Sequence, residues 1–105
     1  MGRDISFILL TEVKEKDALG QMVPSGQPIK RKCIGSQKSV SQSEFFKASQ
    51  VGFEAEGVIE MNPVEYKGEA LILIGGQEFT IYRTYEKDTD KIEVYYGKRV
   101  GNQNG

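Results

Sequence analysis

The chain has 105 residues, of which 38% are hydrophobic, and its net charge is −1. This length suits one domain with one core, and the apolar content excludes disorder of the whole chain. The chain contains no His and a single cysteine, Cys33, which removes the commonest general base, the commonest metal ligand and any intrachain disulfide. We therefore expect no enzymatic activity and no cofactor. Cys33 lies in the run from Ile29 to Ile34 and is expected to be a small core residue.

The charges are unevenly distributed along the chain. No acidic residue lies between Ala18 and Ser43, a stretch that holds Lys30, Arg31, Lys32 and Lys38. Between Glu44 and Tyr96 there are eleven acidic residues and five basic ones. Such asymmetry suits head-to-tail packing of identical subunits or proximity to DNA. It suits an ordinary solvated surface equally well.

The first part of the chain predicts a strand, a long loop and a second strand. Residues 4–13 are rich in β-branched and aromatic residues, which favours a strand buried on much of both faces. The apolar run in it is too short to cross a membrane. Residues 15–28 contain two Gly and two Pro and predict a mobile loop, where Met22 and Val23 have no evident core to join. Residues 29–40 predict the second strand.

A short helix follows, marked by a start signal in the sequence. Ser41 can cap the N–H of Glu44, and Glu44 can reach back to Ser41, as in a capping box. Val40 and Phe45 then occupy the two positions of a hydrophobic staple. The helix is expected to stop before Gly52, which can adopt the left-handed conformation of a helix end.

Four further strands are expected after the helix. Residues 53–61 alternate apolar and polar side chains, which predicts a half-buried strand. Its polar face carries three carboxylates, which we expect to lie in solvent and not to form a metal or acid–base site: Glu54, Glu56 and Glu60. Residues 70–74 and 77–86 flank a Gly-Gly hairpin turn, and residues 91–96 form the last strand.

The register of these hairpins follows from their apolar sets. The expected pairs are Ile72 with Phe79, Ala70 with Ile81, Tyr85 with Ile92, Arg83 with Val94, and Ile81 with Tyr96. This register puts Arg83 in an apolar row, where a buried charge is costly unless it is paired. Glu93 or Glu69 could pair with Arg83, or a subunit contact could use it.

Together these patterns predict a mainly β fold, a small six-stranded β-barrel-like domain with one short helix and a long loop. Closure of the sheet removes exposed strand edges. Residues 1–98 form this single domain, and residues 99–105 are expected to form a flexible tail.

Five tyrosines leave an alternative function open. They could stack nucleic-acid bases, as small barrels that bind single strands do, although the strands that carry them are acidic. The other reading is packing or interface contact. The residues are Tyr66, Tyr82, Tyr85, Tyr95 and Tyr96.

Four motifs follow one another in the second half of the chain: Val40-Ser41-x-Ser43-Glu44-Phe45-Phe46-x-Ala48 with Gly52, Tyr66-x-Gly68-Glu69, Gly76-x-x-Phe79-x-Ile81-x-Arg83-Thr84-Tyr85, and Ile92-Glu93-Val94-Tyr95. In this order they resemble the phage head–tail joining proteins, also called head-closure or head-completion proteins, of the PBSX-like prophage type. The resemblance covers nearly the whole chain, and its specificity comes from the order and spacing of the motifs. Phe79 stands where many relatives carry Tyr, which changes packing.

The resemblance implies a structural protein of the virion connector that is made in the bacterial host cytoplasm. It implies a monomer that assembles into a ring of about twelve copies beneath the portal and adaptor proteins. The ring would retain genomic DNA without sequence-specific binding, dock tail-completion proteins and involve no membrane. The interface candidates are Met22, Val23, Lys30, Arg31, Lys32, Lys38 and Arg83.

Overall fold

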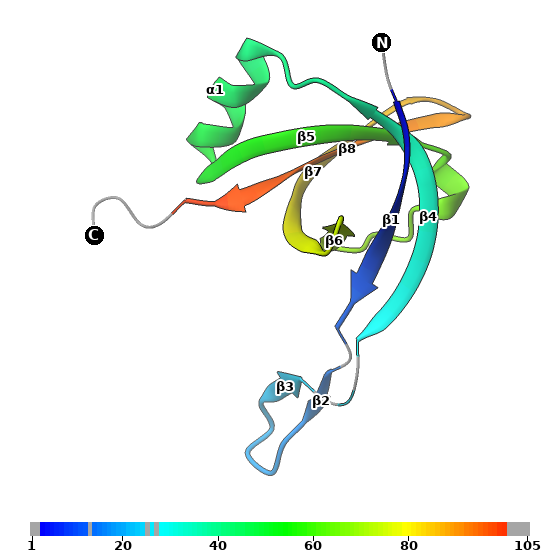
Figure 1. Cartoon of the computed structure of the whole chain (residues 1–105). Coiled ribbons are helices and arrows are strands. Elements are labelled where there is room, and N and C mark those ends of the chain that lie inside the picture. The colour runs from blue at the N-terminus through cyan, green and yellow to red at the C-terminus, as the bar shows by residue number, and fades with distance from the viewer. Residues whose placement is uncertain (1–2, 13, 25, 27, 101–105) are drawn as a thin grey trace.

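A computed structural model describes residues 3–12, 14–24, 26 and 28–100 (Figure 1). Six antiparallel strands close into a barrel in the order β1-β4-β5-β8-β7-β6. The ring closes where Ile8–Leu10 of β1 pairs with Leu71–Leu73 of β6. The strands are β1 (Arg3–Thr11), β4 (Ile29–Lys38), β5 (Phe53–Met61), β6 (Leu71–Ile74), β7 (Gln77–Asp88) and β8 (Lys91–Arg99). They match the six predicted strands, so the expected mainly β, barrel-like fold is confirmed.

The sequence predicted a loop between β1 and β4, but the structure has two short strands in this segment. β2 (Lys14–Lys16) and β3 (Met22–Pro24) pair as a separate two-stranded sheet, which projects from one end of the barrel (Figure 1). The carboxylate of Asp17 accepts hydrogen bonds from the N–H groups of Leu19 and Gln21, at 2.8 and 2.9 Å. Asp17 thereby builds the turn of a hairpin, a local role that the Gly and Pro content of the segment obscured. Mobility of this hairpin stays a prediction.

The helix α1 (Gln42–Gln50) begins and ends where the sequence predicted. The N–H of Glu44 donates to the Ser41 hydroxyl at 3.2 Å, and Gly52 has a φ of +85°. The prediction that Glu44 reaches back to Ser41 is wrong, because the Glu44 carboxylate accepts hydrogen bonds from Tyr82 and Arg83 of β7. Val40 packs against the buried cluster of Ala48, Phe53 and Ala55, whereas Phe45 is about half exposed. No helix in the described part of the chain is long and apolar enough to span a membrane.

The barrel interior holds one apolar core, and Cys33 belongs to it as expected. Its fully buried side chains include Leu9, Ile59, Ile72 and Val94. Strands β5 and β8 approach so closely that a Cβ at Gly97 would overlap the backbone carbonyl of Glu54. The barrel is therefore packed inside and offers its outer faces for contacts.

The register agrees with the prediction up to Ile81 and then departs from it. The pairs Ile72–Phe79 and Ile81–Tyr96 are confirmed, and the N–H of Ile81 donates to the Ala70 carbonyl at 2.8 Å. A β-bulge then leaves Tyr82 as an extra residue on β7. The expected pairs of Arg83 and Tyr85 are consequently wrong by one residue: Arg83 lies opposite Tyr95, and Tyr85 lies opposite Glu93.

The last strand extends further toward the C-terminus than the sequence suggested. Arg99 is the last residue of β8, and the N–H of Val100 donates to the Gly52 carbonyl at 2.9 Å. The start of the expected tail therefore belongs to the sheet. Residues 101–105, together with residues 1 and 2 of the expected domain, lie outside the described part of the chain.

Candidate interaction surfaces

The bulge in β7 brings Arg83 to Glu44 of α1. The Arg83 Nη2 donates to Glu44 Oε1 at 2.5 Å, and the Tyr82 hydroxyl donates to Oε2 at 2.6 Å. The guanidinium carbon lies 3.8 Å from the centre of the Tyr95 ring. Arg83 thus has a carboxylate partner, as expected for a charge in an apolar row, but the partner is Glu44 and neither Glu93 nor Glu69. The bulge is the reason, because it redirects the side chains of β7.

Glu44 is the most deeply buried charged side chain of this group, with 3% of its surface exposed. Burial by itself raises the pKa of the Glu44 carboxyl. The hydrogen bonds from Arg83 and Tyr82 outweigh burial, so the pKa lies below its ordinary value. The carboxylate therefore stays ionised and fixes α1 to the barrel.

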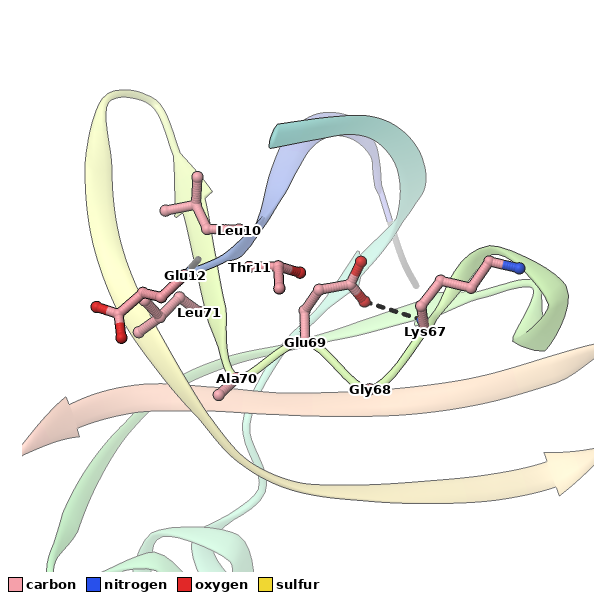
Figure 2. Close-up of a pocket in the computed structure, with 8 residues that line it drawn as sticks. All are labelled: Leu10, Thr11, Glu12, Lys67, Gly68, Glu69, Ala70 and Leu71. Atoms are coloured by element: carbon pink, nitrogen blue, oxygen red, sulfur yellow. Dashed lines mark hydrogen bonds between the residues drawn. The ribbon is translucent and has the colours of Figure 1, made fainter. Parts of the chain in front are cut away.

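A second buried carboxylate, Glu69, orders the loop before β6. Arg31 donates to Glu69 Oε2 through Nε at 3.0 Å and Nη2 at 2.7 Å, and it also contacts the Glu65 carbonyl. The N–H of Lys67 donates to Glu69 Oε1 at 2.9 Å (Figure 2). Burial raises the pKa of Glu69, but the bonds from Arg31 and the Lys67 N–H outweigh it and lower the pKa. Arg31, an interface candidate, is thus already engaged within the chain.

The turn that presents Glu69 uses the other residues of the same motif. The Tyr66 hydroxyl donates to the Glu69 carbonyl at 2.7 Å. Gly68 has a φ of +86°, a conformation that favours glycine. The motif Tyr66-x-Gly68-Glu69 therefore acts as a structural unit that holds this loop against β4.

A four-residue ion-pair cluster covers part of the outer face of the sheet. Glu60 and Glu93 lie directly opposite each other on β5 and β8. Lys38 lies 3.0 and 3.6 Å from these carboxylates, and Lys87 lies 3.3 and 3.8 Å from them. The hydrogen bond from Lys38 is the main cause that lowers the pKa of Glu60. Glu60 therefore does not lie on an unpaired solvated face, and Lys38 is also engaged.

Four of the predicted interface residues stay available, on the projecting hairpin and in the first part of β4. Met22, Lys30 and Lys32 are exposed, and Val23 is partly buried. Two further apolar side chains, which the sequence analysis did not single out, are exposed there: Leu19, at 82%, and Ile29. Leu19 and Met22 are therefore exposed apolar side chains of the hairpin, and Ile29 is one at the start of β4.

The helix presents a second apolar surface. Glu44 and Ala48, four residues apart, define its buried face, so Phe45 and Phe46 face away from the barrel. Phe46 is 65% exposed. The i, i+4 spacing of Glu44 and Ala48 was the signal in the sequence that could have identified the outward face of the helix.

The tyrosines are mostly committed to internal contacts. The hydroxyls of Tyr66, Tyr82 and Tyr95 each donate to another group of the chain, and the Gln37 amide donates to the buried Tyr96 hydroxyl. Tyr85 alone of the five is classed among the exposed large side chains of the described residues. A base-stacking surface would therefore depend on Tyr85.

A cavity of about 410 Å³ lies between the end of β1 and the loop before β6. Figure 2 shows that the carboxylates of Glu12 and Glu69 in its lining point away from each other. The cavity therefore does not bring them together as an acid–base pair. In the part of the chain that the structure describes, no group of three or more metal-ligating side chains comes together.

No protein-family model, curated protein or solved structure matches this chain. The surfaces and the sequence motifs must therefore carry the functional argument.

Proposed function

We propose that this protein is a structural head–tail connector of a phage or prophage, without enzymatic activity. In this role it assembles as a ring under the portal and adaptor, retains the packaged DNA and docks the tail. It is made in the host cytoplasm and ends in the virion connector. The resemblance described above supports the proposal, and so does the small closed barrel.

The motif residues support the proposal through their structural roles. Glu44, Glu69 and Arg83 hold separate elements together through buried or half-buried ion pairs. Their charged groups are paired within the chain, so in this proposal these residues maintain a scaffold and do not act on a substrate. A scaffold of this kind works by presenting surfaces to partners.

The observation that carries the proposal is the hairpin that projects from the barrel (Figure 1) and exposes two apolar side chains, Leu19 and Met22. A two-stranded hairpin is marginally stable by itself and has two unpaired edges. Contact with neighbouring proteins would cover both the edges and the apolar side chains. The exposed cations Lys30 and Lys32 lie at the base of the same hairpin.

The test is to mix the protein with the cognate portal–adaptor complex and to image the product. We expect added ring density below the adaptor, and its absence would refute the proposal. Replacing Leu19 and Met22 by Asp should abolish the added density without unfolding the barrel. Tyr85→Ser is the matched control on another surface and should leave the ring intact.

The same control variant tests the nucleic-acid alternative. If the protein is a single-strand-binding module, Tyr85→Ser should weaken salt-dependent binding of an oligonucleotide. Under the connector proposal, wild type and Tyr85→Ser should show equally weak binding.

A further inference from the structure

Two exposed apolar features lie on opposite sides of the barrel. On one side, α1 presents Phe46 outward beside the half-exposed Phe45. On the other side, β4 presents Ile34, which is 72% exposed, next to the short helix η1 (Pro63–Glu65). Figure 1 shows α1 and the light-green coil of η1 at opposite sides of the molecule. One feature is a protruding aromatic side chain, and the other borders a hollow.

The hollow is a groove bounded by β1, β4 and η1, with a volume of about 520 Å³. Ile34 lies in its wall, and the buried Cys33 contributes to its lining. Such a volume accommodates an aromatic ring, which prefers an apolar site of matching shape. The remaining lining residues are Ser6, Lys32 and Glu65.

Charge at the two features is complementary in one orientation. Lys47 follows Phe46 in the helix and is exposed. Glu65, whose side chain is about half exposed and lies 4.0 Å from Arg31, borders the groove. Lys32 borders it as well and would repel Lys47. A bound helix would therefore turn Lys47 toward Glu65 and away from Lys32, which defines its orientation.

We propose that the Phe46 face of α1 in one copy of this chain binds in the β4–η1 groove of the next copy. The occupant is a second copy because this one chain carries both the protruding aromatic residue, with Lys47 beside it, and the groove, with Glu65 at its border. This inference rests on the proposed ring and names the surfaces through which its subunits meet. It leaves the exposed apolar side chains of the hairpin, Leu19 and Met22, free for the neighbouring rings.

The two contact surfaces differ, so the interface is heterologous. Repetition of such a contact gives a ring if the rotation between copies closes, and a filament if it does not. A two-fold symmetric dimer would instead bring like residues together. The pairing of residue 46 with residue 34, as opposed to 46 with 46, is therefore the diagnostic observation.

Disulfide trapping tests this pairing directly. Phe46→Cys and Ile34→Cys chains are mixed in equal amounts, oxidised mildly, and the linked peptides are identified by mass spectrometry. We expect a 46–34 disulfide about tenfold more abundant than the 19–34 disulfide of a control mixture with Leu19→Cys. Wild type should give no dimer because Cys33 is buried. A mixture that yields only 46–46 and 34–34 disulfides, or none, overturns the inference.

Substitutions test the contact within the assembled ring. Phe46→Ala keeps a strong helix former at an exposed position, and Ile34→Thr keeps a β-branched residue, so both should fold. We expect each to weaken incorporation into the ring about tenfold. Rings that form equally well with both variants overturn this inference and leave the connector proposal intact. A 46–34 disulfide without any ring on the portal–adaptor complex refutes the connector proposal and supports the contact.

Discussion

The attachment of α1 to the barrel depends on one buried carboxylate, which makes Glu44→Gln the most informative single change. Glu44 accepts three hydrogen bonds, two from Arg83 and one from Tyr82. Gln keeps one acceptor oxygen but turns an amide NH₂ group toward the remaining donors. Breaking a fully buried ion pair costs about 3–5 kcal/mol.

The expected loss is smaller than that limit because the Arg83 side chain is 35% exposed, so water can solvate part of its charge. Hydrogen bonds to a charged group contribute about 1.5–3 kcal/mol. We therefore expect Glu44→Gln to lower the free energy of unfolding by about 2 kcal/mol. For a domain of this size, that corresponds to a decrease in Tm of roughly 10 °C.

Urea unfolding followed by far-UV circular dichroism measures this loss. Glu54→Gln, on the exposed face of β5, is the matched control and should change stability by less than about 0.5 kcal/mol. A double-mutant cycle with Arg83→Met should show that the two changes are not additive. A loss below about 0.5 kcal/mol for Glu44→Gln, or strict additivity in the cycle, would refute the argument.

The same carboxylate makes stability depend on pH. The pKa of Glu44 is lowered in the folded protein from its ordinary value of 4.5. In the acid range the unfolded chain therefore binds more protons than the folded protein does. The contribution of Glu44 to the free energy of unfolding is present above about pH 4.5 and is lost as the pH falls through the pKa of Glu44 in the folded protein. Glu60 and Glu69 contribute with the same sign. The stability gap between wild type and Glu44→Gln should therefore narrow in acid, and a constant gap would contradict this origin.

Three further predictions concern the barrel itself. Gly97→Ala should cost about 2–3 kcal/mol in urea unfolding, because its Cβ would overlap the Glu54 carbonyl, and unchanged stability would contradict that close approach. Cys33, whose pKa is raised by burial, should react with a thiol reagent only as the protein unfolds, so rapid labelling of the folded protein would be the contrary result. Tyr96→Phe should lose the hydrogen bond from Gln37 and about 1 kcal/mol, and an unchanged Tm would show that this bond contributes nothing.

Several elements could be predicted because their signals are local. The alternation at residues 53–61 and the cap at Ser41 depend on near neighbours, and both are confirmed. The hairpin turn at Gly75-Gly76 also positioned Ile72 opposite Phe79 correctly. The Asp17 turn is equally local, but the Gly and Pro residues around it favoured the wrong interpretation.

The candidate contacts were less predictable because they join distant parts of the chain. Glu44 and Arg83 are separated by 39 positions, and Arg31 and Glu69 by 38. Which cation meets which carboxylate depends on strand order and on the bulge at Tyr82. The pattern of apolar and polar residues predicts neither the bulge at Tyr82 nor the order of the strands in the barrel.

The amino-acid sequence by itself determined the six barrel strands, the helix ends and the burial of Cys33, because backbone periodicity and capping act over a few residues. Tertiary structure alone decided which charges are neutralised and which apolar side chains stay outside. Arg31, Lys38 and Arg83 carry positive charge in any conformation, yet barrel closure places each beside a carboxylate. Closure also turns Phe46 outward, since the inward face of its helix is taken by Glu44.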